Sequence, residues 1–301
     1  MISASFCRVF VFLEEELMEK DYKHEMPYRD DWKRLSGKLP VKMTNDYLFR
    51  ALLQADEKTL IALIASLLHL RTKNVKSVLI TNPIELGESI DDKEINLDVS
   101  VVLNNEKKVN LEMQVAHEEG WVERTLLYIS RSFDQLNHGE MYDEAKPVIQ
   151  ISFTDFTLFE EEPEFYATYM WINRKKLTQV YSDKMVISNV NLSRIDLATE
   201  EDKKYCIDKW AKIFKATTWE ELKMLATADK NTEQAISSIW QLTEEEKIRD
   251  QIRYREERER EHNHLIDKLK RLEGQVADKD NRIAELEKMV ADLNRLNKGY
   301  K

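Results

Sequence analysis

Apolar and polar residues alternate along two neighbouring segments of the chain, residues 95–103 and 109–115. Most of their apolar side chains fall at odd-numbered positions, among them Leu97, Val99, Val101, Leu103, Val109, Leu111, Met113 and Val115. This period of two predicts β-strands whose odd-numbered side chains face one core. The polar, asparagine-containing link between them, residues 104–108, predicts the tip of an antiparallel hairpin.

The even-numbered positions of this hairpin carry Asp98, Glu112 and Gln114. If both apolar faces meet one core, the tip must hold an odd number of residues, which places Asp98 opposite Glu112 or Gln114. Mg²⁺ prefers carboxylate and carbonyl oxygens, and a phosphodiester can complete its shell. Asp98, Glu112 and the carbonyl of Met113 are therefore candidate ligands for Mg²⁺ or Mn²⁺.

Two other interpretations of these carboxylates stay open. In a two-layer sheet the even-numbered side chains would simply face water, which is common for antiparallel hairpins. Two carboxylates can also serve a glycosidase, although nothing near them resembles a platform for stacking sugars.

The flanking segments predict the other elements of a mixed fold. Residues 75–80 and 148–153 are typical of strands, residues 119–139 of a helix, and residues 44–68 of two short helices or one helix bent near Asp56. Helices on both sides of the strands favour a three-layer α/β/α sandwich. Residues 165–172 and 184–190 are candidates for further strands. Thr218 and Thr243, each followed by glutamate three residues later, predict helix starts.

The helix predicted after the hairpin has two different faces. Its polar and aromatic face carries Arg124, Tyr128, Arg131 and Gln135. Its apolar residues, which we expect to face inward, are Leu127, Phe133 and Leu136. Because arginine binds phosphate with two parallel hydrogen bonds, Arg124, Tyr128 and Arg131 are candidate DNA contacts beside the metal. A solvated helix face explains the same spacing equally well.

Composition limits the classes of partner and compartment. The 301 residues carry a formal net charge of -10, which argues against indiscriminate wrapping of nucleic acid, so any DNA contact must be a local patch. The two cysteines, Cys7 and Cys206, form neither a disulfide framework nor a zinc spacing. We therefore expect a reducing, cytoplasmic location, and no segment is long and apolar enough to span a membrane.

The first residues are predicted to be a mis-annotated leader. Glutamates 14–16 stand just before Met18, as a translated ribosome-binding site would. We expect residues 1–17 to be disordered and Met18 to be the true start.

The C-terminal residues predict a coiled coil. Apolar side chains repeat at spacings of four and three at Leu265, Leu269, Leu272, Val276, Ile283, Leu286, Val290 and Leu293, with Lys279 interrupting the series. Mostly β-branched a positions with leucine at d favour a parallel dimer, here a homodimer through residues 262–297. The alternative is an amphipathic helix that folds back on its own domain. Residues 249–261, rich in arginine and glutamate, are typical of a solvated spacer.

An ordered series of segments resembles a known family. These segments are residues 45–50 (NDYLFR), 112–114 (EMQ), 124–130 (RTLLYIS) and 147–151 (PVIQI). Together they resemble the PD-(D/E)XK nuclease superfamily and, within it, the recombination-promoting nuclease (Rpn) family, whose members are also labelled putative transposases. The resemblance implies a restriction-endonuclease-like core in which Asp98 and Glu112 bind the metal. Gln114 would stand where most members have lysine, and Asp46 would match a further acidic position.

The expected organisation follows from these segments. A nuclease domain would span residues 18–215, a helical extension residues 216–248, and a charged helix with a coiled coil residues 249–301. The expected function is a Mg²⁺-dependent DNA endonuclease, dimerised by its tail. Because glutamine cannot carry the charge of lysine, a catalytically weak or inactive relative that binds DNA or protein is the alternative. A scaffold that uses only the tail is a third possibility.

Overall fold

The computed structural model describes residues 31–82, 99–117, 119–134, 136, 138–227 and 229–298. It divides into two units, with the boundary between Arg249 and Asp250. The predictions for residues 1–17, Met18, Asp98 and Gln135 lie outside the described residues.

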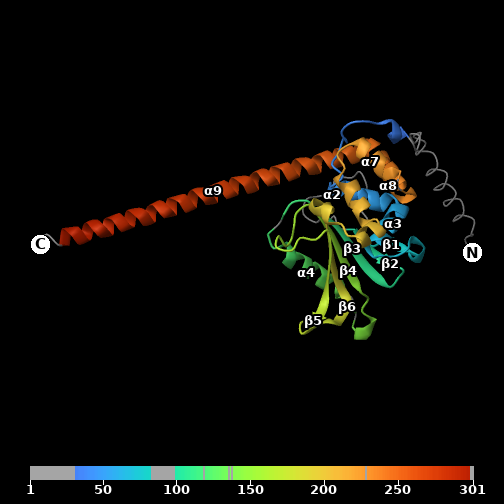
Figure 1. The fold of residues 1–301 in the computed structure, drawn as a ribbon, viewed down its shortest axis with the longest axis horizontal. Coiled ribbons are helices and arrows are strands. Elements are labelled where there is room, and N and C mark those ends of the chain that lie inside the picture. The colour runs from blue at the N-terminus through green and yellow to red at the C-terminus, as the bar shows by residue number, and fades with distance from the viewer. Residues whose placement is uncertain are drawn as a thin grey trace, which may run out of the picture. The chain divides into compact units, whose positions relative to one another are not determined.

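A mixed six-stranded sheet forms the centre of the first unit (Figure 1). Its strands are β1 (Val78–Ile80), β2 (Val99–Leu103), β3 (Lys107–Gln114), β4 (Val148–Thr154), β5 (Tyr166–Asn173) and β6 (Lys176–Asn191), in the spatial order β1-β2-β3-β4-β6-β5. β3, β4 and β6 run parallel, and the remaining neighbours are antiparallel. The strands expected in residues 165–172 and 184–190 thus form one long hairpin at the sheet edge.

The predicted hairpin is present, with an odd number of residues at its tip. Val99 pairs with Leu111 and Leu103 with Lys107, which leaves three residues in the turn. Asn104 and Asn105 adopt positive φ angles of 52° and 57°, a conformation that asparagine tolerates better than most residues. The Asn104 side chain also accepts hydrogen bonds from the backbone amides of Lys76 and Ser77, which ties the tip to the segment before β1.

The odd-numbered side chains of the hairpin face the main core, as predicted. Val99, Val101, Leu103, Val109, Leu111 and Met113 are all buried. Helices α2 (Asp46–Ala55), α3 (Glu57–Leu67) and α6 (Ile207–Lys215) belong to this side. Phe49 of α2, Phe153 of β4 and Phe214 of α6 meet edge to face, with ring centroids 5.2–5.6 Å apart. The bend expected near Asp56 separates two helices, α2 and α3.

Helix α4 (Trp121–Phe133) lies on the other face of the sheet, opposite α2, α3 and α8 (Lys230–Glu244) (Figure 1). The three layers confirm the predicted α/β sandwich. The even-numbered side chains of β3 do not simply face water, because Asn110 and Glu112 are buried. The inward face of α4 differs in part from the prediction: Trp121, Thr125 and Ile129 are buried and Phe133 and Leu136 are half-buried, whereas Leu127 is 57% exposed.

The helices after the sheet complete the first unit. They are α5 (Glu200–Lys204), α6, α7 (Trp219–Ala226) and α8, of which α7 and α8 pack together and α8 packs on α2 and α3. Residues of the predicted helical extension therefore share one unit with the sheet. Short 3₁₀ turns are η1 (Asp31–Arg34), η2 (Thr72–Asn74), η3 (Tyr142–Glu144) and η4 (Leu192–Leu197).

One of the two predicted capping boxes is present. Thr218 accepts from the Glu221 amide, and the Glu221 carboxylate accepts from the Thr218 amide, at the start of α7. The prediction at Thr243 is wrong, because Thr243 lies inside α8 and its hydroxyl donates to the Trp240 carbonyl. The chain instead leaves the helical conformation at Glu245, before α9 (Glu246–Lys298).

Helix α9 is a single helix of 53 residues. It begins in the first unit, and the second unit begins within it at Asp250. Among the residues that the structure describes, no helix has the length and apolarity needed to cross a membrane.

Candidate nuclease site

Glu112 is a buried carboxylate near the end of β3. The residue is only 4% exposed, although it lies on the polar face of the sheet. Its Oε1 accepts a hydrogen bond from Arg124 Nη2 of α4 at 3.0 Å, and its Oε2 accepts one from Gln150 Nε2 of β4 at 3.3 Å. A buried carboxylate without partners would be costly. The ion pair with Arg124 and the bond from the Gln150 amide therefore hold the Glu112 side chain in place.

Arg124 is held by aromatic rings as well as by Glu112. Its guanidinium carbon lies 5.2 Å from the ring centroids of both Trp121 and Tyr128, on the preceding and following turns of α4. Such contacts favour arginine, whose planar group stacks on rings. The side chain is 30% exposed, so it reaches both the buried carboxylate and solvent. The predicted DNA contact is thus also the ion-pair partner of the predicted metal ligand.

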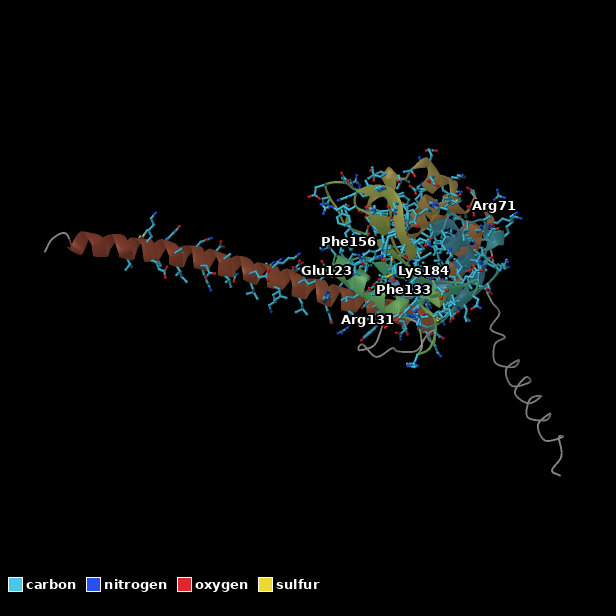
Figure 2. The ribbon with its side chains drawn as sticks, turned by 90° about the horizontal axis from the view of Figure 1, so that it is seen from below. Arg71, Glu123, Arg131, Phe133, Phe156 and Lys184 are labelled. Atoms are coloured by element: carbon cyan, nitrogen blue, oxygen red, sulfur yellow. The ribbon has the colours of Figure 1, made fainter. Side chains whose placement is uncertain are left out.

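The other members of the predicted DNA face have different surroundings. Tyr128 is half-buried beside Arg124, while Arg131 is exposed one turn further along α4. Figure 2 labels Arg131 together with Glu123 and Phe133 of the same helix. Arg131 therefore remains accessible to a phosphate.

Gln114 and Met113 follow Glu112 at the end of β3. The Gln114 amide nitrogen donates to the carbonyl of Ala116 at 2.8 Å, which orients its side chain. Gln114 lies at an even-numbered position like Glu112, whereas the Met113 side chain is buried in the main core. Only the backbone carbonyl of Met113 could therefore serve as a ligand.

Asp46 is the first residue of α2, in the helical layer across the sheet from α4. Its Oδ1 accepts a hydrogen bond from the Tyr47 amide at 2.7 Å, within the first turn of the helix. In the described part of the chain no three histidine, cysteine or acidic side chains gather as metal ligands. Asp98 is outside that part, so Glu112 is the described member of the predicted pair.

Three buried polar residues on the strands beyond Glu112 were not anticipated from the sequence. Gln150, Ser152 and Asn189 are at most 6% exposed and come from β4 and β6. Ser152 pairs with Glu112 on one side and with Asn189 on the other. The polar residues at even-numbered positions 150, 152 and 154 of a buried strand were the signal that could have revealed them.

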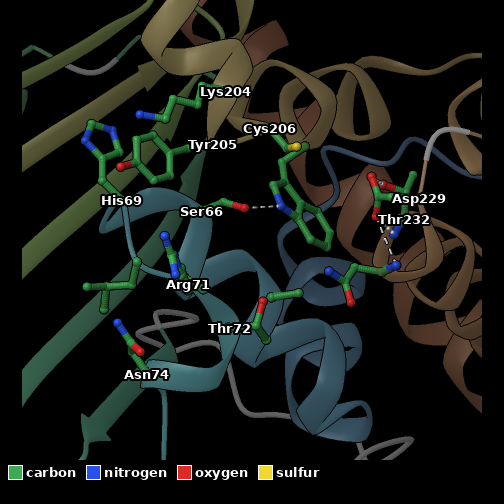
Figure 3. A pocket seen from close by; sticks show the side chains of 15 residues that line it. Ser66, His69, Arg71, Thr72, Asn74, Lys204, Tyr205, Cys206, Asp229 and Thr232 are labelled. Carbon is green, nitrogen blue, oxygen red and sulfur yellow. Dashed lines mark hydrogen bonds between the residues drawn. The ribbon is translucent and has the colours of Figure 1, made fainter.

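A separate cavity lies among helices α3, α5, α6 and α8, with a volume of about 670 Å³ (Figure 3). In it the His69 ring stacks on Tyr205, with centroids 4.5 Å apart, and Trp210 donates to the hydroxyl of Ser66. None of the predicted site residues lines this cavity. Glu112 and Arg124 therefore lie outside this cavity, on the α4 face of the sheet.

Comparison with protein families agrees with this geometry. Residues 43–269 match the model of the PD-(D/E)XK nuclease family transposases. Comparisons with curated proteins and with solved structures found no match. The matched range includes the hairpin, α4, the buried polar face and the helices α5–α8, and it covers well over half of the chain. The chain therefore belongs to the PD-(D/E)XK nuclease family transposases.

Proposed function

We propose that this protein hydrolyses DNA phosphodiester bonds at the end of the β2–β3 hairpin, with Asp98 and Glu112 as ligands of a divalent cation. The observation that carries the proposal is the buried Glu112 carboxylate, held between Arg124 and Gln150 on the polar face of the sheet. Family membership supports a nuclease-like function, and the finer assignments below are our own.

The strand register supports a role for Asp98. Val99 pairs with Leu111, and in this register the next pair would be Asp98 with Glu112. Side chains directly opposite each other in an antiparallel pair have Cβ atoms about 4.5–5.5 Å apart. If the pairing continues by one residue, the two carboxylates therefore reach one cation.

The donors present suit a hard cation such as Mg²⁺, or Mn²⁺, which accepts carboxylate and carbonyl oxygens. Glu112, Asp98 and the Met113 carbonyl would hold it, whereas Asp46, at the start of α2 across the sheet from α4, is assigned no part in this set. When bound, such an ion polarises the scissile phosphate and lowers the pKa of bound water.

Arg124 can provide the positive charge that Gln114 lacks. The guanidinium has five N–H donors, so it can keep one contact with Glu112 and direct others at a phosphate oxygen. Gln114, which has no charge, is left to orient the attacking water through its amide oxygen, since its nitrogen donates to Ala116. Gln150 acts as a positioning residue that fixes the Glu112 carboxylate.

Cleavage of supercoiled plasmid DNA tests the proposal. With Mg²⁺ or Mn²⁺ we expect nicking by the wild type, and a loss of about 100-fold or more in Asp98→Ala and Glu112→Gln, because each removes a metal ligand. Arg124→Met should lose about 10- to 100-fold, in the range of one electrostatic contact to a transition state. Excess EDTA should abolish the reaction.

Glu123→Gln is the matched control, because Glu123 is an exposed carboxylate on α4 beside Arg124. It should cut DNA like the wild type. Equal nicking by the wild type, Asp98→Ala and Glu112→Gln would point to a contaminating nuclease and refute the catalytic assignment.

A catalytically inactive scaffold is the second candidate, and one observation favours it. Arg124 already neutralises Glu112, and Gln114 stands in the place of a lysine. DNA binding by the wild type without cleavage under any divalent cation would support this function.

A further inference from the structure

The cavity in the helical layer has no part in the proposed nuclease function. It lies among α3, α5, α6 and α8 and has a volume of about 670 Å³ (Figure 3). Sites for small ligands usually enclose roughly 300–1,000 Å³. A cavity of about 150 Å³ already admits one benzene molecule, so this cavity has room for a ligand of several times that size.

Two positively charged side chains, Arg71 and Lys204, line the cavity. Figure 3 shows both near His69 at one end, whereas Asp229 lies at the other end. Both residues are exposed, so a ligand in the cavity can reach them. Neither forms an ion pair in the described part of the chain, and Lys204 Nζ lies over the Tyr205 ring, 5.3 Å from its centroid. A negatively charged ligand would give both cations a partner.

The acidic residue of the lining, Asp229, does not oppose an anion. Its Oδ2 pairs with Lys209 Nζ at 3.3 Å. Its Oδ1 accepts hydrogen bonds from the amides of Asn231 and Thr232 at the start of α8. Both carboxylate oxygens are therefore occupied, and Lys209 balances the charge. The lining keeps an excess of positive charge in a chain whose formal net charge is -10.

Neutral polar groups complete the accessible lining. Thr72, Asn74 and Asn231 line the cavity, and all three residues are exposed. Their hydroxyl and amide groups can both donate and accept hydrogen bonds. Such groups suit the hydroxyls of a sugar, whereas the cations at the end near His69 suit an anion.

Two residues of the lining have an uncommon backbone conformation. His69 and Cys206 adopt positive φ angles of 54° and 61°, and the other described non-glycine residues with positive φ are the two asparagines of the hairpin tip. His69 follows the end of α3, where glycine is the usual residue. Its ring, which glycine would lack, stacks on Tyr205 with centroids 4.5 Å apart. Backbone strain of this kind occurs mostly at ligand and active sites.

We propose that this cavity binds a phosphorylated sugar, free or within a nucleotide, with its phosphate between Arg71 and Lys204. A phosphate monoester carries about -1.5 to -2 charges at neutral pH, which matches the two cations. Arginine offers paired N–H donors to phosphate, and lysine adds a point charge. No residue of β3 or α4 lines the cavity, so this inference is independent of the nuclease assignment.

Calorimetric titration of the full chain in EDTA tests this proposal. We expect AMP and ribose 5-phosphate to bind with dissociation constants below about 1 mM, the range in which enzymes usually bind metabolites. Adenosine and ribose lack the phosphate and should bind at least about tenfold more weakly. Cyclic AMP, whose phosphodiester carries one charge, should bind more weakly than AMP. Tighter binding of AMP would identify a nucleotide as the ligand, and tighter binding of ribose 5-phosphate a free sugar phosphate.

Neighbouring basic residues provide matched controls. Arg71→Gln and Lys204→Gln should each weaken the binding of both phosphorylated probes by about 10- to 100-fold, because each removes a charged donor. Lys73→Gln and Lys203→Gln remove the same charge from exposed neighbours that do not line the cavity, so they should bind as the wild type does. All four variants should keep the thermal stability of the wild type, since all four residues are exposed.

Three results would overturn the phosphate site. They are equal affinity for AMP and adenosine, no binding of either phosphorylated probe, and an equal loss of affinity in Lys73→Gln and Arg71→Gln. Displacement of AMP by short duplex DNA, with the same loss of duplex binding in Arg71→Gln, would overturn it in favour of a contact with the DNA backbone. Glu112→Gln should lose cleavage but bind AMP as the wild type does, so either proposal can fail without the other.

Discussion

Asp56 connects three helices through one carboxylate. It ends α2, and its Oδ1 accepts from the amides of Lys58 and Thr59 at the start of α3. Its Oδ2 accepts from Gln234 and Ser238 of α8 and from the Thr59 hydroxyl. Burial alone would raise the pKa of this carboxyl, but the hydrogen bonds from Ser238, Gln234 and Thr59 outweigh it and lower the pKa below its usual value.

Asp56→Asn should therefore destabilise the protein by about 1–3 kcal/mol at neutral pH, since it weakens a helix cap and charge-assisted bonds. A lowered pKa stabilises the folded state above the unfolded pKa of about 3.9, and this stabilisation is lost as pH falls through the folded value. Urea unfolding at neutral pH and between pH 5 and 3 measures both effects. The wild type should lose its advantage over Asp56→Asn towards pH 3. Glu57→Gln, at an exposed neighbouring carboxylate, should show neither effect.

At the candidate site, the sequence predicted roles for single residues but not the contact between them. Glu112 was expected to bind a metal because of its place in the hairpin, and Arg124 to contact DNA because of its place on the polar face of the next helix. Their ion pair was not expected, since it depends on which turn of α4 lies over β3. Ser152 becomes a neighbour of Glu112, and Asn189 a neighbour of Ser152, only through the parallel ladders to β4 and β6, which pair residues far apart in sequence.

The orientation of α4 shows why the apolar pattern alone does not predict the buried side of a helix that packs on a polar sheet face. By hydropathy, Leu127 should face inward and Thr125 outward. The face beneath the helix carries Asn110 and Glu112, and these bind polar partners on α4: Ser132 for Asn110 and Arg124 for Glu112. Satisfying these buried groups fixes the helix rotation and leaves Leu127 exposed.

The hairpin was predictable because strand geometry decides which side chains face the core. A shift of one residue in register would turn every side chain to the wrong face, so the alternating pattern requires an odd number of residues in the tip. Residues 104–106 form that three-residue tip.

The two Thr-x-x-Glu motifs, at Thr218 and Thr243, lie in different structural contexts. Thr218 is extended and caps α7, whereas α8 continues through Thr243 and ends at Glu244. We expect Thr218→Val to lower the free energy of unfolding by about 1 kcal/mol, because it removes a capping bond. Thr243→Val should cost less, about 0.5 kcal/mol, because its hydroxyl only adds a second bond to a helix carbonyl. Urea denaturation of both variants compares them. A larger cost at Thr243 would contradict the helix boundary at Glu245.

On the scale of the whole molecule, the family match continues from the sheet into α9, up to residue 269. The apolar positions predicted for the coiled coil begin at Leu265 and continue beyond the match. Those described, Leu265, Leu269, Leu272, Val276, Ile283, Leu286 and Val290, are 46–59% exposed in the single chain. A long helix with an exposed apolar stripe is stabilised when a second helix covers that stripe.

We therefore propose that residues 262–297 form a parallel homodimer, which would bring two nuclease sites to one DNA duplex and allow double-strand cleavage. The wild type should sediment at twice the 35.7 kDa chain mass. Ile283→Asp places a charge at an a position of the stripe and should yield a monomer, whereas Asn281→Asp adds the same charge on the outer face and should leave the dimer intact.

Lys279→Leu, which replaces the lysine that interrupts the d positions, should tighten the dimer. A wild type that stays monomeric at micromolar concentrations, or a dimer that survives Ile283→Asp, would contradict the coiled coil. If Ile283→Asp nicks plasmid but no longer linearises it, the loss of paired sites explains the change, because Ile283 lies far along the chain from Glu112.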